Sequence, residues 1–392
     1  MSSNHTTLSE VADINPRADW KSVNQHSIVS FVPMAAVSDI DYRITAEQER
    51  PLEEVKKGFT YFQRGDVILA KITPCFENGK VALADIQHEY GFGSTEFHVI
   101  RAKEGVTHPR FLYYLLRQPS IILEGTKNMT GSGGQRRVPK VFLENLPLTL
   151  PPLDIQQRIA DTLDTADALR RKDQELLRKY DDLAQSIFYE MFGDPVTNTQ
   201  KWSVLKISDM IDFMTSGSRG WSAYYSEQGD LFIRINNVVK GKLVLDDVVY
   251  VNAPDNAEAR RTRVQPGDVL VSITADLGRV AVIPEGIGEA FINQHLALLR
   301  FKQEFVPEYI AFYLSSSAGQ AQIQRNNKGG VKAGLNFADI LGIDILVPPK
   351  HLQQKFTDAI RGVDELAMLT KANIQTSMSL FESLLSASFT TN

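Results

Sequence analysis

The sequence LPLTLPPLDIQQ at residues 146–157 returns as IDILVPPKHLQQ at residues 343–354, which is 197 residues later. Each copy joins a short run of strand-forming residues to a long segment with helical spacing, through two adjacent prolines. Prolines end strands because they have no backbone N–H to donate to a neighbouring strand. The junction therefore predicts one plan used twice: a mixed segment that closes on a strand, followed by a long helix.

The duplication extends through both mixed segments. Further stretches recur in the same order: FVPMAAV (31–37) as FIRINNV (232–238), GDVILAKIT (65–73) as GDVLVSIT (267–274), GKVA (79–82) as GRVA (278–281), and HPRFLYY (108–114) as VPEYIAF (306–312). The offset drifts only between 202 and 197, and so long a period indicates duplicated domains rather than solenoid repeats. We expect two α/β (α+β) domains at 1–153 and 194–349, and two long helices at 154–193 and 350–392.

Each domain carries matching signals for its elements. Runs rich in strand formers follow the Gly-Asp turns and precede the Pro-Pro pairs, and short helical runs follow a proline. The expected strands are 67–69, 97–100 and 148–150 with counterparts 269–271, 296–299 and 345–347, and the expected helices are 111–116 and 309–314.

Apolar residues recur every three or four positions in both long segments, as in the seam of a coiled coil. The expected seam consists of Ile159, Leu163, Leu169, Leu176, Leu183 and Ile187, with Phe356, Ile360, Val363, Leu366, Leu380 and Leu384. A second apolar line suggests a surface covered by a partner, and it consists of Leu177, Ala184, Phe188, Ile374, Phe381 and Leu385. A helical hairpin that only closes a core is the alternative; it is disfavoured because a whole domain separates the two segments. Their spacing leaves parallel and antiparallel packing open.

Composition and charge narrow the class of protein. The apolar fraction of 43% and the mean hydropathy of -0.18 fit a soluble globular protein without a membrane span or signal-peptide core. The single cysteine, Cys75, excludes an internal disulfide and a multi-cysteine zinc site, and we expect a cytoplasmic location. The net charge is -5, and its excess negative charges all lie in the helical segments, so the domains are neutral. Binding to nucleic acid by this chain alone should be weak, and a partner is expected to supply much of the contact with phosphates.

The sequence lacks the motifs of several enzyme classes. It has no phosphate-binding Walker loop, and the residues around the Pro-Pro pairs do not fit an adenine methyltransferase. Asp66, Glu77 and Lys80 resemble a nuclease metal site only loosely, because the second copy keeps Asp268 but has no acid that matches Glu77 beyond Asp276. His98 and His295 are interpreted as ordinary polar positions. We expect no catalytic residue and no metal ligand.

At this point the chain resembles a known family, the specificity (S) subunit of type I restriction–modification enzymes, over essentially its whole length. The most specific marker is the strand, Pro-Pro, Gln-Gln helix junction, which is present twice. The Gly-Asp stretches at 65–68 and 267–270 and the Gly-rich turns at 131–134 and 329–330 match the same pattern. Residues before Phe31 show no clear counterpart, so the start of the first domain is poorly placed.

The resemblance implies a non-catalytic subunit in a phage-defence system. Each domain, a target-recognition domain, would bind one half of a bipartite double-stranded DNA site, while antiparallel helices set the spacing and dock two modification (methyltransferase) subunits. Restriction subunits would join through these. The resemblance also implies that this chain binds no cofactor: S-adenosylmethionine would belong to the methyltransferase subunit, and ATP and magnesium to the restriction subunit.

Candidate DNA-binding residues are basic and amide side chains in loops. Arginine pairs with two acceptors on guanine, and asparagine or glutamine pairs with two groups on adenine. In the first domain the candidates are Lys71, Asn78, Lys80, Gln135, Arg136, Arg137 and Lys140; in the second they are Arg219, Trp221, Arg234, Asn236, Asn237, Lys240, Arg279, Asn293, Gln294, Lys328 and Lys332. For the stretch from Ser216 to Trp221, DNA contact and local packing are equally good interpretations.

Two other functions stay open on the residues alone. A duplicated nuclease or methyltransferase would show activity in the purified chain. A duplicated scaffold that binds only proteins would fail to bind specific DNA even with its partner present.

Overall fold

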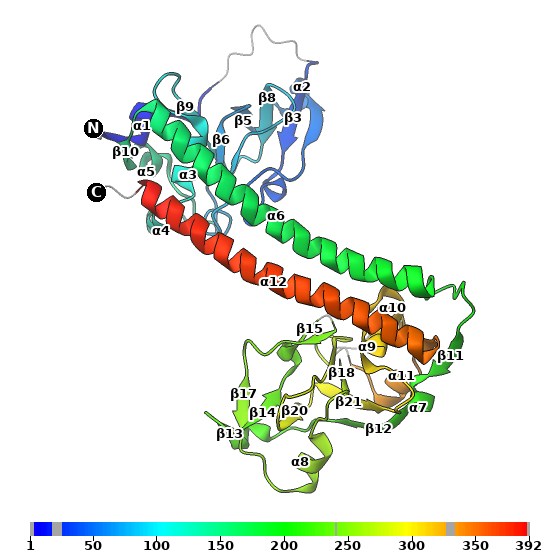
Figure 1. Ribbon diagram of the computed structural model, residues 1–392. Coiled ribbons are helices and arrows are strands. Elements are labelled where there is room, and N and C mark those ends of the chain that lie inside the picture. Colours follow the sequence, from blue (N-terminus) through cyan, green and yellow to red (C-terminus); the bar gives the residue numbers. More distant parts are fainter. Residues whose placement is uncertain (1–3, 18–25, 240, 327–333, 390–392) are drawn as a thin grey trace. The chain divides into compact units, whose positions relative to one another are not determined.

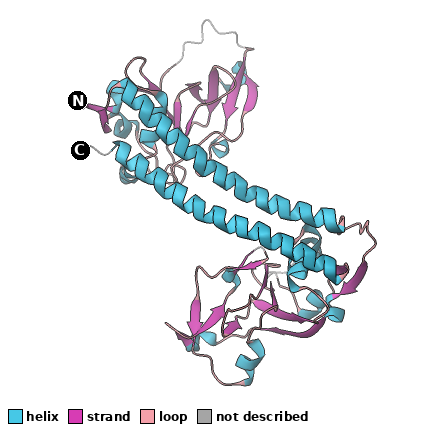
Figure 2. Cartoon of the chain, in the orientation of Figure 1, coloured by secondary structure: helices cyan, strands magenta, loops and turns pink. Residues whose placement is uncertain are grey.

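The computed structural model describes residues 4–17, 26–239, 241–326 and 334–389. The chain forms two compact units: unit 1 comprises residues 1–176 with 370–392, and unit 2 comprises residues 177–369. Each unit combines one mixed domain with half of each long helix, α6 (Leu153–Phe192) and α12 (Lys350–Phe389) (Figure 1). Strands occur only in the mixed domains (Figure 2) among the described residues.

Unit 1 contains two four-stranded sheets. The first is antiparallel with the order β2-β9-β6-β7, and its strands span Ala12–Ile14, Phe97–Ala102, Val67–Ala70 and Val81–Leu83. The second has the order β4-β3-β8-β5, with β3 and β8 parallel, and its strands span Gln48–Pro51, Ile28–Val32, Tyr90–Gly93 and Thr60–Gln63. The last strand, β10 (Pro147–Leu150), pairs with β1 (Asn4–Thr7).

Unit 2 repeats the antiparallel sheet, whereas its mixed sheet has its fourth strand at the opposite edge. Its antiparallel sheet has the order β12-β21-β18-β19, over Ile211–Ser216, Leu296–Phe301, Val269–Ser272 and Val280–Val282. Its mixed sheet has the order β13-β17-β14-β20, over Tyr225–Ser226, Val249–Val251, Asp230–Ile233 and Ala290–Ile292. β22 (Asp344–Val347) pairs with β11 (Ser203–Lys206), and β15 (Val238–Val239) pairs with β16 (Lys242–Leu243). The duplicated α/β plan is confirmed, strand for strand in the antiparallel sheets.

Short helices pack against both sheets of each unit. In unit 1 they are α1 (Leu8–Val11), α2 (Leu52–Val55), α3 (Pro109–Leu116), α4 (Pro119–Lys127) and α5 (Lys140–Glu144), with the 3-10 turn η1 (Met34–Ala36). In unit 2 they are α7 (Ile207–Met210), α8 (Ala257–Thr262), α9 (Pro307–Ser315), α10 (Ser317–Asn326) and α11 (Phe337–Leu341), with the turns η2 (Trp221–Tyr224) and η3 (Ile235–Asn237).

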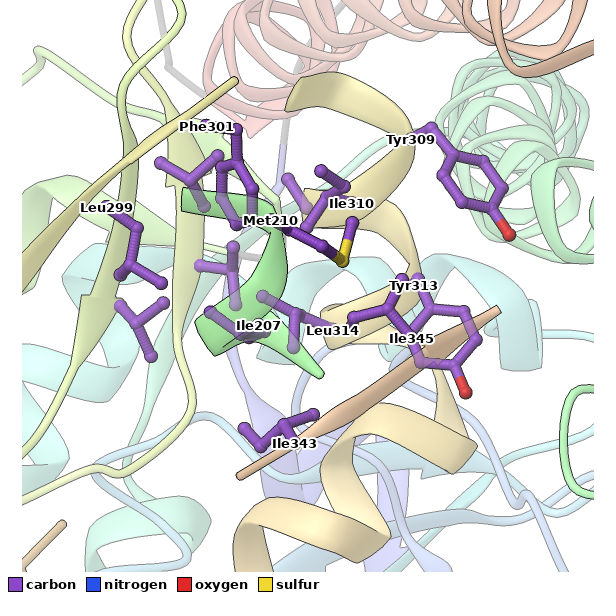
Figure 3. Close-up of a cluster of buried hydrophobic side chains, with 14 of the residues drawn as sticks. Ile207, Met210, Leu299, Phe301, Tyr309, Ile310, Tyr313, Leu314, Ile343 and Ile345 are labelled. Carbon is purple, nitrogen blue, oxygen red and sulfur yellow. The ribbon is translucent and has the colours of Figure 1, made fainter. Parts of the chain in front are cut away.

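The central strands are buried on both faces, so they consist almost entirely of apolar residues. Along β6, Val67 and Leu69 pack with α3 and the long helices, whereas Ile68 packs toward the mixed sheet. β18 repeats this alternation. Figure 3 shows one side of the core of unit 2, where Tyr309 and Tyr313 from α9 lie beside the last strand.

The two Gly-Asp turns have a structural role. Asp66 is buried, and its carboxylate accepts two hydrogen bonds from Arg101 on β9, at 2.8 and 2.7 Å. Asp268 is buried too, and it accepts two hydrogen bonds of 2.7 Å from Arg300 on β21. Bidentate charged pairs of this kind fix the geometry of the turn against the neighbouring strand. They explain why both copies keep the aspartate without any metal chemistry.

The first glutamine of each Gln-Gln pair joins the long helix to its domain. Gln156 is fully buried; its Oε1 accepts the N–H of His108, and its Nε2 donates to the carbonyls of Val106 and Pro151. Gln353 in unit 2 accepts the N–H of Val306 at 3.2 Å and donates to the carbonyl of Pro348 at 2.7 Å. One amide thereby satisfies backbone groups on both sides of the strand–helix junction.

The two long helices run antiparallel, as the resemblance implied. In unit 1 Leu163, near the start of α6, shares a core with Phe381 near the end of α12. In unit 2 Phe188, near the end of α6, packs against Phe356 near the start of α12, with ring centroids 5.6 Å apart.

The expected seam is wrong for five leucines. Leu163, Phe356 and Val363 lie buried, and Ile159, Ile187, Ile360 and Leu384 are partly buried in the core. Leu169, Leu176, Leu183, Leu366 and Leu380 are exposed. Part of the second line, Phe188, Phe381 and Leu385, lies buried instead.

The sequence misplaced the seam because the two apolar lines lie one residue apart, as at Leu380 and Phe381. Both satisfy the same heptad spacing, so periodicity cannot choose between them. Phe188 and Phe381 of the second line pack into the core. Three polar residues of the long helices are buried as well: Asp167, Thr370 and Ser377.

We predict that Gln353→Leu destabilises unit 2. The change removes the partners of the Val306 N–H and the Pro348 carbonyl, and each buried group left unpaired costs about 1–3 kcal/mol. Urea unfolding measures the loss. Gln354→Leu is the matched control, because Gln354 is exposed and should change the free energy of unfolding by less than about 0.5 kcal/mol. Equal effects of the two substitutions would contradict this role of Gln353.

Candidate nucleic-acid interface

In unit 1, loops 37–45, 71–80 and 130–137 come together beyond the strand ends. The N–H of Thr73 donates to the carbonyl of Arg136 at 2.9 Å, and the N–H of Val138 donates to the carbonyl of Lys71 at 2.8 Å. Asn78 Nδ2 donates to Asp39 Oδ2 at 3.3 Å, which connects the first loop to the second. The structure therefore brings most candidates of the first domain to one surface, which we call the unit 1 loop surface.

The arginines of this surface are paired with acids. Arg136 lies 2.8 Å from Glu77, and Arg137 donates two hydrogen bonds to Glu96, at 2.9 and 2.8 Å. The Arg137 pair holds the pKa of the Glu96 carboxylate below its ordinary value, despite some opposing desolvation. A phosphate would have to compete with these carboxylates for the arginines.

The remaining candidates differ in their surroundings. Lys140 is exposed and pairs with Glu144 one helical turn later, at 2.8 Å. Lys71 and Lys80 are partly buried, Gln135 is exposed, and none of the three has a carboxylate partner among the described residues. These lysines are the cations of the unit 1 loop surface that are most available to phosphate.

In unit 2, loops 216–221, 273–279 and 293–295 form the corresponding unit 2 loop surface. Ser218 and Asn293 form a parallel bridge, and the N–H of Ile273 donates to the carbonyl of His295 at 2.9 Å. Thr274 bridges to Gly334, just beyond residues 327–333. Lys240, Lys328 and Lys332 lie outside the described residues.

Three candidates of the second domain are corrected because their side chains are buried. Trp221 is 3% exposed, stacks on Phe232 at 5.2 Å and donates to Glu258 at 2.9 Å, so local packing is the right interpretation. Asn237 is 2% exposed, accepts the N–H of Arg234 and donates to the carbonyls of Val244 and Asp247. Asn293, 7% exposed, accepts the N–H of His295. Amides that satisfy buried backbone groups look the same in a sequence as amides that bind bases.

The other candidates of unit 2 are accessible to different degrees. Arg219 and Asn236 are exposed, and Gln294 is partly exposed. Arg234 pairs with Asp247 at 2.7 Å, and Arg279 pairs with Asp276 at 2.6 Å.

Sequence reasoning missed Arg261, which lies on α8. It donates to Thr215 Oγ1, to the carbonyl of Ser216 at 2.7 Å and to Ser218 Oγ at 3.2 Å. The run of arginines from Arg260 to Arg263 was a visible signal, but nothing in the sequence connects it to a loop more than forty residues earlier.

A second missed group is a buried charge network in unit 1. Arg117, at the end of α3, donates to Asp167 on α6 at 3.3 Å, and Arg170 donates to the same carboxylate at 3.1 Å. The Arg117 guanidinium also lies 4.1 Å from the ring of Tyr42, in loop 37–45. The long helix thus contacts the unit 1 loop surface through two side chains.

Within the ranges that the structure describes, no group of three or more His, Cys, Asp or Glu side chains could hold a metal ion. His98 is buried; Nε2 lies 2.8 Å from the Val138 carbonyl, and burial lowers the pKa of the imidazole. Over the same ranges, no helix is long and apolar enough to cross a membrane.

Known proteins share this organisation. The family model of the type I restriction modification DNA specificity domain matches residues 4–178 and 199–377. The EcoAI specificity subunit of Escherichia coli is 40% identical over 155 residues, which are 39% of this chain and 26% of that relative. A putative MjaX specificity subunit of Methanocaldococcus jannaschii is 23% identical and covers 77% of this chain and 72% of its own length. The chain thus matches only about a quarter of the length of the EcoAI subunit.

Two solved structures share the fold. The S subunit of a type I restriction-modification system from M. genitalium has a TM-score of 0.59 at 14% identity and covers 100% of this chain and 97% of its own. A chain from a structure on assembly and conformational transition of the type I R-M system has a TM-score of 0.58 at 21% identity, over 98% and 97%. With both halves matched by the family model, the chain belongs to the type I restriction modification DNA specificity family.

Proposed function

We propose that this chain is the DNA specificity subunit of a type I restriction–modification complex, in which each unit binds one half of a bipartite DNA target. The observation that carries this proposal is a shared scaffold with different loops. The buried groups recur in both units, as in Asp66 and Asp268 or Gln156 and Gln353. The loop surfaces differ in length and residue type, so each unit would recognise its own sequence.

The charge of the loop surfaces supports weak binding by the chain alone. Arg136, Arg137 and Arg279 on these surfaces pair with nearby acids, and affinity for DNA depends strongly on the number of unpaired cations. A partner that supplies further phosphate contacts would raise the affinity, whereas the loops would supply the choice of sequence.

Catalysis is assigned to the partner subunits in this proposal. S-adenosylmethionine would bind to the modification subunit, and ATP and magnesium would bind to the restriction subunit. This chain would bind no cofactor, and its own contribution would be recognition and assembly.

The exposed leucines of the long helices are the proposed docking surface for the modification subunits. Leu169, Leu176 and Leu183 follow one another at intervals of seven residues on α6, so they lie on one face. Leu366 and Leu380 form a similar line on α12, fourteen residues apart. Exposed leucines at heptad spacing are typical of a helix that packs against another helix.

We predict that exchanging residues 195–348 for those of another member changes only one half of the methylated motif. The chain would be co-expressed with a modification subunit from the same source, and methylated positions would be mapped on genomic DNA. The expected wild-type result is one split motif, of which the exchange replaces one half and retains the other.

A change in both halves after the exchange would contradict independent recognition by the two units. A stable complex that yields no split motif would favour the protein-binding scaffold instead. Methylation by the purified chain alone would favour the duplicated enzyme.

We also predict that Leu176→Lys combined with Leu183→Lys weakens assembly with the modification subunit at least tenfold. Both side chains are exposed, so the melting temperature of the chain should change little. Titration of the modification subunit by calorimetry gives the affinity. Gln185→Lys is the control for added charge, because it introduces one lysine at an exposed position facing away from Leu183. Unchanged affinity of the double variant would rule out this surface.

A further inference from the structure

Loop 216–221, which we call the Arg219 loop, follows β12 and is held from one side by Arg261. The Arg261 guanidinium bonds to Thr215, to the Ser216 carbonyl and to Ser218. An arginine whose hydrogen bonds all go to neutral groups keeps its full charge beside the loop. It therefore fixes the start of the loop and adds positive potential to it.

The other side of the loop is equally constrained. A Cβ on Gly217 would lie 2.2 Å from the carbonyl oxygen of Asn293, so only glycine fits there, and Ser218 forms a bridge with Asn293. Gly220 has a φ of 97°, which favours glycine as well. The loop ends at buried Trp221. Ser216 to Ser218, before Arg219, and Trp221, two residues after it, are thereby tied to the body of unit 2.

Arg219 itself is exposed at the tip of this anchored loop. Five of the eight arginines in residues 194–349 pair with a carboxylate: Arg234, Arg260, Arg263, Arg279 and Arg300. Within the described part of the chain, Arg219 has neither a carboxylate partner nor a hydrogen bond. The fold holds its backbone in place and leaves its guanidinium available.

A loop with a fixed backbone is better suited to contact a base than to contact a phosphate. A phosphate can be contacted by a cation from many directions, so a lysine on a flexible loop is sufficient for a phosphate contact. Recognition of guanine requires two parallel N–H donors in the plane of the base, directed at O6 and N7 in the major groove. A fixed backbone lowers the ordering cost of that geometry.

We infer that Arg219 recognises a guanine in the half-site bound by unit 2, and that Arg261 is the positioning residue of the Arg219 loop. This inference rests on the proposed function, since it assigns one base of the site to one side chain. It predicts which position of the motif is read by this loop and which substitutions relax it.

The test maps methylated positions in cells that express the chain with its modification subunit, for wild type and for Arg219→Ala, Arg219→Lys and Arg261→Ala. Arg219→Ala should relax one guanine position in one half of the motif, with a loss of discrimination of about 5- to 150-fold. The other half and the gap should stay the same. Arg261→Ala should weaken discrimination at that same position, which a merely stabilising residue would not do.

Arg260→Ala is the matched control, because Arg260 is an exposed neighbour that pairs with Asp255 and should leave the motif unchanged. An unchanged motif in Arg219→Ala would overturn the inference. If methylation decreases equally at all sites in Arg219→Ala and is restored in Arg219→Lys, Arg219 contacts a phosphate. That result would overturn the inference as well. Failure of the wild type to give any split motif would instead contradict the proposed function itself.

Discussion

One buried amide at each strand–helix junction holds this architecture together. Gln156 satisfies backbone groups from the end of β10 and from the segment before α3, while it belongs to α6. Gln353 does the same for α12 in unit 2. Because the bonds are buried, the direction in which each long helix leaves its domain is fixed by side-chain chemistry rather than by a flexible linker.

Much of the fold could be predicted from the sequence because the two halves of the chain can be compared with each other. Two copies of the junction located the starts of the long helices, and the Gly-Asp pairs located the central strands. The buried Asp66–Arg101 and Asp268–Arg300 pairs could not be predicted, because each arginine lies more than thirty residues from its aspartate. Periodicity likewise predicted that the long helices pack, but two adjacent lines of apolar residues satisfied the same period.

The candidate site was predictable by region and less so by residue. Among the described residues, the polar candidate loops do gather into one surface in each unit. Which amides remain free depends on the backbone groups that they bind in the folded chain, as Asn237 and Asn293 show. Arg261 could not be predicted, because its partners lie in a loop that is distant from it in the sequence.

The central claim is that two recognition units share one pair of helices that sets the distance between half-sites. The most direct measurement is to insert one heptad after Leu176 and one after Leu369, where the two units meet in the sequence, and to map the methylated motif. Each insertion adds about 10 Å of helix. At about 3.4 Å per base-pair step, the gap should lengthen by roughly three base pairs with both half-sites unchanged. An unchanged gap in a complex that still assembles would contradict the account.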